Sequence, residues 1–422
     1  MRILLLSQFY PPETGAAQNR LCYLARWLAS SGHTVTVLTA LPNYPVGAIY
    51  EGYRGRFLME EQNGGVRIIR TWLYATKSKG FFRRVFSYCS FSTLSLLAGI
   101  LKVGWQDVVI VESPPLPLGL TGFLISRLKR ARFALNISDL WPESAVALGV
   151  LKNRRAIQVA IRLEEFLYRK ADLITGQTKG IVASIQSRCV CKSVTLIPNG
   201  VDTSVFTPDT HGAGVEQGIR TSFNLNGHFV VGYAGLFGLA QGLDTVVDST
   251  KLLAKFPKIL IALIGDGPES ARLKELAKAG GLRNIRFCPA QPVSRMPQVL
   301  RVFDVALVPL KRHALFKGAL PSKMFEAMGA GVPVICSVDG EAREVIEKSR
   351  GGIYVQPESS EGIAQAILQL YRDAVLRKSL GENGRRYVAD HYCRHKAATQ
   401  FEKLLIPADS RNETAHMARA GA

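Results

Sequence analysis

The stretch Gly318-Ala-Leu-Pro-Ser-Lys-Met-Phe-Glu326-Ala-Met-Gly-Ala-Gly-Val-Pro-Val-Ile335 predicts a loop, a short helix, a glycine turn and a buried strand in succession. Pro321 and Ser322 are typical of a helix start, and Gly329 and Gly331 are typical of a helix end. The apolar run after the glycines is typical of a buried strand. The stretch therefore predicts one helix–strand unit of an α/β fold.

Two charged residues lie near the start of this predicted helix, Lys323 in its first turn and Glu326 one turn further along. A cation in the first turn opposes the helix dipole by a few tenths of a kcal/mol to about 1 kcal/mol. Lys323 is therefore better explained if an anion, such as a nucleotide diphosphate, binds at that helix start. Glu326 could then accept hydrogen bonds from ribose hydroxyls. The alternative is an ordinary surface helix with a mixed-charge face.

Strands and helices alternate along the chain in two series, and such repeated βαβ units predict two doubly wound parallel sheets of the α/β class. We interpret residues 208–227, rich in Gly, Thr and Asp, as a linker or surface loop between the series. With 422 residues, two domains are expected. Their predicted bounds are residues 1–200 for the first domain, 201–390 for the second, 391–406 for a helix that could cross back to the first, and 407–422 for a disordered tail.

The net charge of +20 is unevenly distributed, because residues 1–198 carry 25 Lys and Arg against 11 Asp and Glu. Nucleic acid or anionic lipid could explain such an excess. We find no nucleic-acid-binding motif and expect no nucleic-acid partner. The seven cysteines are scattered, which favours a reducing cytosol. The first apolar run, Arg2–Leu6, is too short for a signal peptide.

The basic stretch 77–84 precedes 17 uncharged residues, Val85–Leu101, which is at the lower limit for a spanning helix. We expect this helix to lie on or dip into an anionic membrane surface, although a buried core helix is the alternative. The predicted membrane-contacting residues are Lys77, Lys79, Phe81, Phe82, Arg83 and Arg84.

Six short motifs follow one another at normal spacings: Pro198-Asn-Gly-Val-Asp202 with Phe206, Tyr233-Ala-Gly-Leu-Phe-Gly238, Gly265-Asp-Gly-Pro268, Phe303-Asp-Val-Ala-Leu-Val-Pro309, Glu326-Ala-Met-Gly-Ala-Gly-Val-Pro-Val334 and Gly351-Gly-Ile-Tyr-Val-Gln-Pro357. A chain with these motifs resembles a family 4 glycosyltransferase of the GT-B fold, over nearly its whole length. Four further motifs resemble the bacterial subgroup that builds O-antigen, capsule and colanic-acid-type polysaccharides, including fucosamine transferases: Tyr10-Pro-Pro-Glu13, Asp139-Leu-Trp-Pro-Glu143, Ala240-Gln-Gly242 and Pro321-Ser-Lys323.

The resemblance implies two Rossmann-like domains facing a cleft, the second binding a nucleotide sugar and the first presenting the acceptor. It implies a retaining transferase that moves a sugar, expected to be a UDP-linked N-acetylated one, to a lipid-linked saccharide at the cytoplasmic face of the inner membrane. No Asp-x-Asp motif occurs in the sequence, so we expect no metal and no other cofactor. The sequence does not identify the donor sugar, the acceptor, the linkage or the oligomeric state.

The chain departs from the family pattern at three places. The family pairs two glutamates; Glu326 matches the second, but the first falls on Gly318. The usual Arg and Lys of the glycine-rich turn fall on Leu236 and Gln241. The nearby candidates to replace these cations are Lys323, Arg312 and Lys317, in that order.

The expected site residues follow from these matches. Catalytic residues would be Asp139, Lys323 and Glu326, although Asp139 could equally be a helix cap. Donor-binding residues would be Gly15, Gly235, Gln241, Gly267, Arg312, Pro321, Ser322, Lys323 and Glu326. Acceptor-binding residues would be Asn19, Arg20, Asp139 and Glu143.

Three other classes of protein are alternatives to a glycosyltransferase. A dehydrogenase would need Gly-x-Gly-x-x-Gly after a strand, and the glycines at 232, 235 and 238 have the wrong spacing. A nucleotide-sugar 2-epimerase shares the GT-B fold and is a closer alternative. A non-catalytic membrane-associated scaffold of GT-B fold is the third, given the missing cations.

Overall fold

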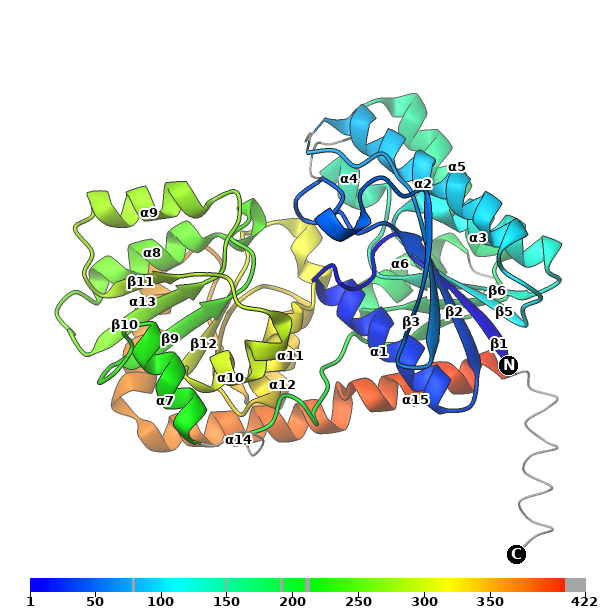
Figure 1. Cartoon of the computed structure of the whole chain (residues 1–422). Coiled ribbons are helices and arrows are strands. Elements are labelled where there is room, and N and C mark those ends of the chain that lie inside the picture. The colour runs from blue at the N-terminus through cyan, green and yellow to red at the C-terminus, as the bar shows by residue number, and fades with distance from the viewer. Residues whose placement is uncertain (78–79, 148, 150, 190–192, 209–212, 407–422) are drawn as a thin grey trace, which may run out of the picture. The chain divides into compact units, whose positions relative to one another are not determined.

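The computed structural model describes residues 1–406 apart from 78–79, 148, 150, 190–192 and 209–212. The chain folds into two compact units (Figure 1). Unit 1 comprises Met1–Pro198 and the residues from His395 onward, and unit 2 comprises Asn199–Arg394. The predicted tail over 407–422 lies outside the described residues, as does Lys79.

Unit 1 is built on an eight-stranded sheet of order β3-β4-β2-β1-β5-β6-β7-β8. β3 runs antiparallel to β4, and all other neighbouring strands are parallel. The elements are β1 (Arg2–Leu6), α1 (Ala16–Ser30), β2 (Thr34–Ala40), β3 (Leu58–Asn63), β4 (Val66–Thr71), α2 (Phe81–Leu101), β5 (Val108–Ser113), α3 (Leu116–Leu128), β6 (Arg132–Ile137), α4 (Glu143–Ala147), α5 (Arg154–Lys170), β7 (Leu173–Gly176), α6 (Lys179–Arg188) and β8 (Val194–Leu196).

Both faces of this sheet are apolar, as expected for parallel strands covered by helices on each side. Leu4 and Leu6 pack with α2, α3 and α5 on one face. Ile3 and Leu5 pack with α1 on the other face, together with α15 (Arg394–Leu405). Among the described residues, α15 is the last helix, and its side chains complete the core of unit 1.

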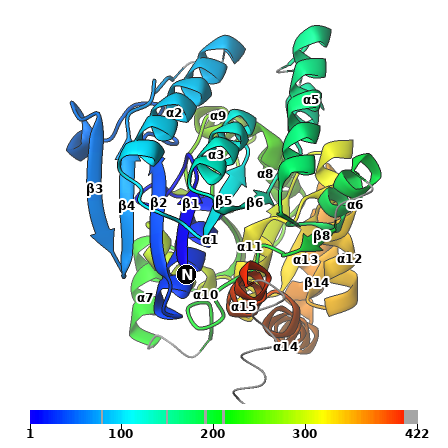
Figure 2. The ribbon, with the colours of Figure 1, turned by 90° about the vertical axis from the view of Figure 1, so that its right-hand side faces the viewer.

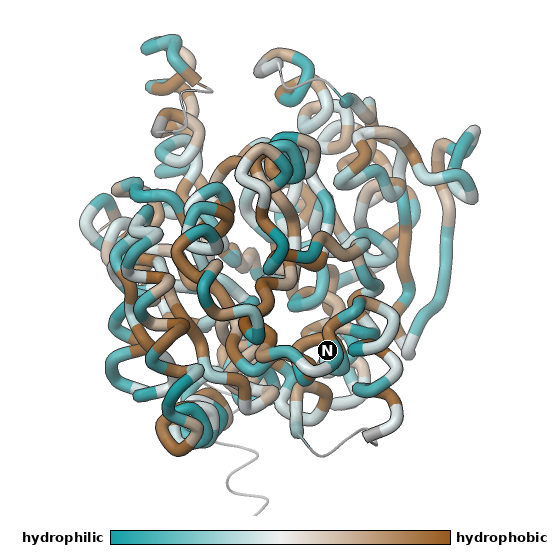
Figure 3. Tube along the Cα trace, turned by 90° about the vertical axis from the view of Figure 1, so that its left-hand side faces the viewer, coloured by the Kyte–Doolittle hydropathy of each residue, from teal (hydrophilic) through white to brown (hydrophobic). Residues whose placement is uncertain are grey.

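Unit 2 is built on a six-stranded parallel sheet of order β11-β10-β9-β12-β13-β14. Hydrophobic and hydrophilic residues alternate along its helices, as Figure 3 shows. The elements are α7 (Ala213–Ser222), β9 (Phe229–Ala234), α8 (Leu243–Leu252), β10 (Ile259–Ile264), α9 (Ser270–Ala279), β11 (Ile285–Cys288), α10 (Met296–Arg301), β12 (Val305–Pro309), α11 (Ser322–Gly329), β13 (Val334–Ser337), α12 (Glu341–Ser349), β14 (Gly352–Tyr354), α13 (Ser360–Arg372) and α14 (Ala374–His391). Two doubly wound α/β sheets are thus confirmed.

The interpretation of residues 208–227 as a linker or loop is wrong, because α7 forms within them. Ile219 packs against the core of unit 2, and the Arg220 guanidinium donates a hydrogen bond to the Val302 carbonyl at 2.9 Å. Glu216 forms an ion pair with Arg301. These tertiary contacts stabilise a helix that contains two glycines, which have low intrinsic helix propensity.

The strand β3 was not predicted, because its sequence Leu-Met-Glu-Glu-Gln-Asn lacks an apolar run. This strand lies at the edge of the sheet and pairs with one neighbour only, β4. Its side chains are therefore mostly solvated, and the apolar signal that identified the central strands is absent.

Candidate active site

The carboxyl ends of β9 and β10 lead into two glycine turns that pack backbone against backbone. Gly235 and Gly265 have φ values of 145° and 152°, which disfavour any other residue. A Cβ on Gly265 would lie 1.9 Å from the Gly235 carbonyl oxygen, and a Cβ on Gly267 would lie 2.5 Å from that of Phe237. Ligands of doubly wound folds bind at this edge of the sheet. The glycines therefore leave the backbone close to where a ligand would bind.

The first turn of α11 brings Lys323 to the same place. Pro321 precedes this helix, and Ser322 is its first residue. The Lys323 ammonium donates a hydrogen bond to the Tyr233 hydroxyl at 2.7 Å. It would lie 3.1 Å from a Cβ on Gly235. The helix start, the lysine and the glycine turn after β9 thus converge.

Burial lowers the pKa of Lys323 to about 8, and the charge of Glu326 opposes this shift. A lysine with a lowered pKa in a partly buried position is stabilised in its charged form when an anion binds beside it. The geometry at Lys323 therefore fits an anion such as a diphosphate.

Glu326 lies one turn along α11 from Lys323 and is partly buried. Burial raises the pKa of its carboxyl group, while the charges of Arg394 and Lys323 lower it. Its oxygens accept no hydrogen bond from the residues that the structure describes. The carboxylate can therefore accept hydrogen bonds from ligand hydroxyls.

Other predicted donor residues lie in the loops at this edge of the sheet. Gln241 ends a short 3-10 turn after β9, where its amide oxygen would lie 2.6 Å from a Cβ on Gly238. Arg312 follows β12 and donates a hydrogen bond to the Pro357 carbonyl at 3.3 Å. Arg312 and Lys317 line a pocket that Lys323 does not line.

In unit 1, Gly15 caps the start of α1 with an extended φ of 168°, so this position needs no glycine for backbone conformation. Asn19, in the first turn of α1, is partly buried. Arg20 is only 8% exposed, and its guanidinium pairs with Glu112 on β5. The prediction that Arg20 contacts an acceptor does not fit this burial. The buried Glu112 carboxylate, on a central strand, needs a cationic partner, and Arg20 provides it.

The Glu112 carboxylate also accepts a hydrogen bond at 2.6 Å from the side-chain amide of Asn136 on β6. The Asn136 amide oxygen accepts one at 2.8 Å from the Thr175 hydroxyl on β7. The network fixes three neighbouring strands to α1.

Asp139 follows β6 and is exposed. Desolvation by surrounding protein raises the pKa of its carboxyl group, and hydrogen bonds from Ser144 and Leu140 lower it. A carboxylate with a raised pKa is better suited to accept a proton. Leu140 precedes α4 and Ser144 donates through its side chain, so neither donor is a backbone N–H of the helix start, and the base role of Asp139 stays a prediction.

Glu143 begins α4 and forms an ion pair with Arg188 at 2.9 Å. The same guanidinium donates to Glu164 at 2.6 Å. Burial raises the pKa of Glu164 to about 7. Glu143 is therefore engaged within the protein, a partnership that its sequence position does not indicate.

Glu13 belongs to a family motif and was not predicted as a site residue, yet its side chain organises two loops. It is 1% exposed and accepts hydrogen bonds from the backbone N–H groups of Tyr10, Asn43 and Tyr44. The sequence signal that could have indicated this role of Glu13 is an acidic residue in a proline-rich loop. Tyr233, the partner of Lys323, was also missed as a site residue because it lies within an apolar strand.

The predicted membrane residues lie at the start of α2. Lys77, Phe82, Arg83 and Arg84 are exposed, with Phe82 at 84%. Phe81 is the first residue of the helix. Among the described residues, one helical segment, Phe82–Leu101, is long and apolar enough to cross a membrane, and a third of its most apolar window is buried in the protein.

Two doubly wound units in one chain, with glycine turns and a lysine at a helix start on a carboxyl edge, define the GT-B glycosyltransferase class. Family models agree: that for group 1 glycosyl transferases matches residues 217–387, and that for a glycosyl transferase 4-like domain matches residues 15–200. The chain belongs to the family 4 glycosyltransferases of GT-B fold, and the predicted resemblance is confirmed.

Individual relatives cover nearly the whole chain. WcaI of Escherichia coli (strain K12), described as a colanic acid biosynthesis glycosyl transferase, is 28% identical over 90% of this chain and 95% of its own length. A GDP-mannose-dependent phosphatidylinositol monomannoside mannosyltransferase of Mycobacterium tuberculosis is 26% identical over 92% of this chain and 93% of its own. The structure of Anabaena HepE with UDP-glucose has a TM-score of 0.70 at 17% identity, covering 96% of this chain and 99% of that one.

Proposed function

We propose that this protein is a retaining glycosyltransferase of bacterial surface polysaccharide synthesis. It transfers a sugar, an N-acetylated one in our proposal, from a UDP-linked donor to a lipid-linked saccharide. The relative described as acting in colanic acid biosynthesis and the structure with UDP-glucose support this assignment.

The proposal rests mainly on the proximity of the Lys323 ammonium to the glycine turn at Gly235. The Lys323 ammonium, the N–H groups at the start of α11 and the backbone of the glycine turn together suit a diphosphate. Glu326, without a hydrogen-bond partner among the described residues, would accept hydrogen bonds from the ribose hydroxyls.

The chemistry needs a stabilised leaving group more than a protein nucleophile. As the bond from the anomeric carbon to the diphosphate oxygen breaks, negative charge grows on that oxygen, and Lys323 lies where it can stabilise the charge. The acceptor hydroxyl attacks from the same face, which retains the anomeric configuration. Asp139, whose pKa is raised by desolvation, would orient this hydroxyl or take its proton.

The acceptor's lipid would be reached through the outer surface of α2 and α3. These helices pack side by side over one face of the unit 1 sheet (Figure 2). Both expose large apolar side chains: Phe82, Phe86, Leu97, Ile100 and Leu101 on α2, and Leu120, Leu124 and Leu128 on α3. Arg83 and Arg84 add positive charge beside them. This combination suits an anionic membrane surface.

The opposite side of α2 is part of the protein core. Phe91 and Ser95 are fully buried, and the Ser92 carbonyl accepts a hydrogen bond at 2.9 Å from the Thr121 hydroxyl on α3. A helix packed this way would lose those contacts if it crossed the bilayer. We therefore propose that α2 lies on the cytoplasmic leaflet of the inner membrane and does not span it.

A screen of UDP- and GDP-sugars with membrane extract tests the function, with sugar incorporation into lipid as the readout. Transfer with the α-configuration preserved from an α-linked donor, seen by NMR, supports the proposal. Conversion of the nucleotide sugar without transfer to any acceptor would favour an epimerase. Failure to bind any nucleotide would favour a non-catalytic scaffold.

A further inference from the structure

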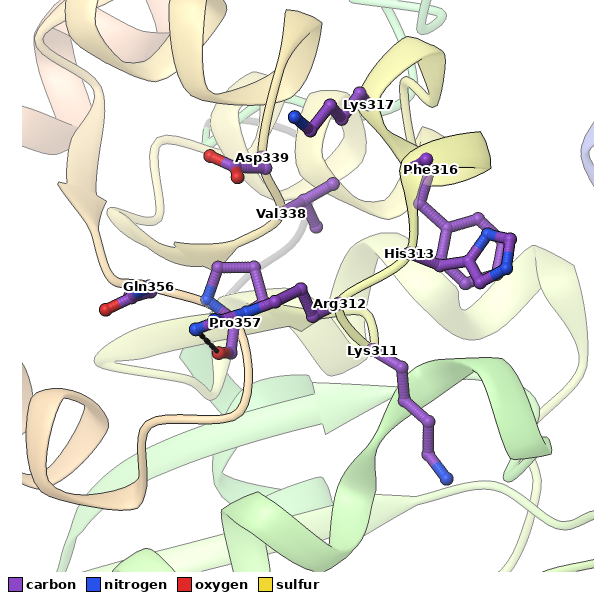
Figure 4. Close-up of a pocket in the computed structure, with 10 residues that line it drawn as sticks. Lys311, Arg312, His313, Phe316, Lys317, Val338, Asp339, Gln356 and Pro357 are labelled. Atoms are coloured by element: carbon purple, nitrogen blue, oxygen red, sulfur yellow. Dashed lines mark hydrogen bonds between the residues drawn. The ribbon is translucent and has the colours of Figure 1, made fainter.

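A pocket of about 280 Å³ lies at the carboxyl edge of β12, β13 and β14 in unit 2 (Figure 4). This volume is at the lower limit for small-molecule sites, so the pocket suits a single sugar ring better than a whole nucleotide sugar. Its apolar lining includes Phe316, Val338 and Pro357, which could contact the C–H face of such a ring.

The charged lining of this pocket is mainly positive. Lys311, Arg312 and Lys317 contribute three cations, and Asp339 contributes the one carboxylate. The loop that supplies the cations, residues 311–320, contains no Asp or Glu. In Figure 4 the Lys311 side chain extends away from the others, whereas Arg312 and Lys317 flank Val338 from two sides. Two cationic groups therefore face the pocket.

These two cations have unused hydrogen-bonding capacity. Within the part of the chain that the structure describes, the Arg312 guanidinium, which has five N–H donors, makes one hydrogen bond, to the Pro357 carbonyl. The Lys317 ammonium has no hydrogen bond or ion pair with the residues that the structure describes. Asp339 is already engaged, since it accepts a hydrogen bond at 2.8 Å from the Tyr354 hydroxyl.

The backbone around the pocket is closely packed. Gly340, directly after Asp339, has a φ of 74°, and a Cβ there would lie 2.0 Å from the Lys317 carbonyl oxygen. The 3-10 turn Ala314–Gly318 therefore contacts the turn after β13. Lys317, which follows β12, therefore also lies beside the turn that follows β13.

We propose that this pocket binds a carboxylate carried by the donor sugar, so that the preferred donor is a nucleotide-linked uronic acid, whether or not it is also N-acetylated. This inference rests on the proposed glycosyltransferase function. Arg312 would bind the carboxylate through two parallel N–H···O hydrogen bonds, and Lys317 would add a point charge. The diphosphate would then be bound by Lys323 and the start of α11.

Binding of matched donor pairs by calorimetry tests the proposal: UDP-glucose with UDP-glucuronate, UDP-galactose with UDP-galacturonate, UDP-N-acetylglucosamine with its uronic acid, and GDP-mannose with GDP-mannuronate, with free UDP and GDP as references. We expect an acidic member to bind more tightly than its neutral partner. Arg312→Gln and Lys317→Gln should weaken binding of that acidic donor roughly 10- to 100-fold. Binding of the free nucleotide should stay at the wild-type value.

Two controls accompany the variants. Arg312→Lys keeps the charge but loses the planar pair of donors, so it should recover only part of the affinity. Lys378→Gln removes an exposed cation of α14 that does not line the pocket, and it should leave the affinity for the acidic donor unchanged. Equal unfolding midpoints would show that the variants fold.

The outcomes separate this inference from the proposed function. If nucleotides bind but no acidic donor is preferred, the inference is wrong and the proposed function stands. If Arg312→Gln and Lys317→Gln weaken free nucleotides and neutral donors equally, these cations bind the diphosphate and the inference is likewise wrong. If no nucleotide binds at all, the proposed function fails and the inference with it.

Discussion

At the scale of single residues, the function proposed here depends most on Lys323. Its ammonium lies between the Tyr233 hydroxyl and the glycine turn after β9, where an anionic ligand would favour its charged form. Leu236 and Gln241 stand where the family pattern has cations, so we expect Lys323 to carry more of the electrostatic stabilisation than it would elsewhere in the family.

We predict that Lys323→Ala and Glu326→Gln each reduce transfer while the fold stays intact. Losing one charged partner of the donor should remove about 2–4 kcal/mol of transition-state stabilisation. Steady-state kinetics of the purified variants at saturating donor would measure this loss. Lys348→Ala, at an exposed residue of α12 paired with Glu344, is the matched control and should keep wild-type turnover. Near-normal turnover in either site variant would contradict the assignment.

The pH dependence of donor use should also depend on Lys323. Because its pKa in the free protein is about 8, the fraction that is charged falls as the pH rises through that value. The diphosphate needs the charged form, so kcat/KM for the donor should decrease above about pH 8. Lys323→Arg should move this alkaline limb upward, since an arginine stays protonated. An unchanged alkaline limb in that variant would show that another group titrates.

At the scale of whole elements, α2 and α15 contrast in how a helix uses its apolar residues. α2 buries one side and exposes the other, with Leu101 at 77% exposure. α15 buries Ala398, Phe401 and Leu405 in the core of unit 1. The Glu402 carboxylate of α15 also accepts hydrogen bonds from Trp27 at 3.0 Å and from Ser31 at 3.3 Å.

We predict that α2 docks unit 1 on anionic membranes. Each basic residue near such a surface contributes about 1 kcal/mol, so a variant with four glutamines should bind far more weakly. High salt should have the same effect where apolar insertion is shallow. Flotation with anionic liposomes would compare wild type with the variant in which Gln replaces Lys77, Lys79, Arg83 and Arg84. If both float equally, or neither floats, the acceptor need not be membrane-bound.

A pair of identical substitutions tests the packing of α15. Phe401→Ala, at a side chain 2% exposed, should lower the free energy of unfolding of unit 1 by about 3–5 kcal/mol. Phe82→Ala, at a side chain 84% exposed, should change it by less than about 0.5 kcal/mol. Denaturant unfolding measures both. Equal effects would mean that α15 does not contribute to this core.

At the scale of the whole molecule, positive charge is supplied by side chains in both units. The chain carries 53 Lys and Arg against 33 Asp and Glu, and no Asp-x-Asp motif. A leaving diphosphate can therefore be stabilised by Lys323 and a helix start, as the geometry of unit 2 allows.

We predict on this basis that transfer does not require a divalent metal. Treatment with EDTA should leave the rate of sugar incorporation largely unchanged. Complete loss of activity, restored by Mg²⁺ or Mn²⁺, would show that a metal stabilises the leaving group. Purified protein assayed with a metal-free donor and acceptor provides the cleanest comparison.

The amino-acid sequence was enough to predict the two doubly wound sheets, the order of their elements along the chain and the helix start at Lys323. These follow from local patterns: apolar runs identify buried strands, Pro and Ser mark the start of α11, and the three-residue spacing places Lys323 and Glu326 one turn apart. Where the local signal was weak, prediction failed. The polar edge strand β3 and the Gly-rich helix α7 are both stabilised by contacts with distant residues.

Which side chains meet is evident only in the folded chain. The hydrogen bond between Lys323 and Tyr233 joins residues 90 positions apart, and that between Arg20 and Glu112 joins residues 92 apart. The sequence alone suggested that Arg20 binds the acceptor, whereas folding buries Arg20 against Glu112. Such pairings depend on strand order and packing, which bring together residues whose local sequences carry no sign of each other.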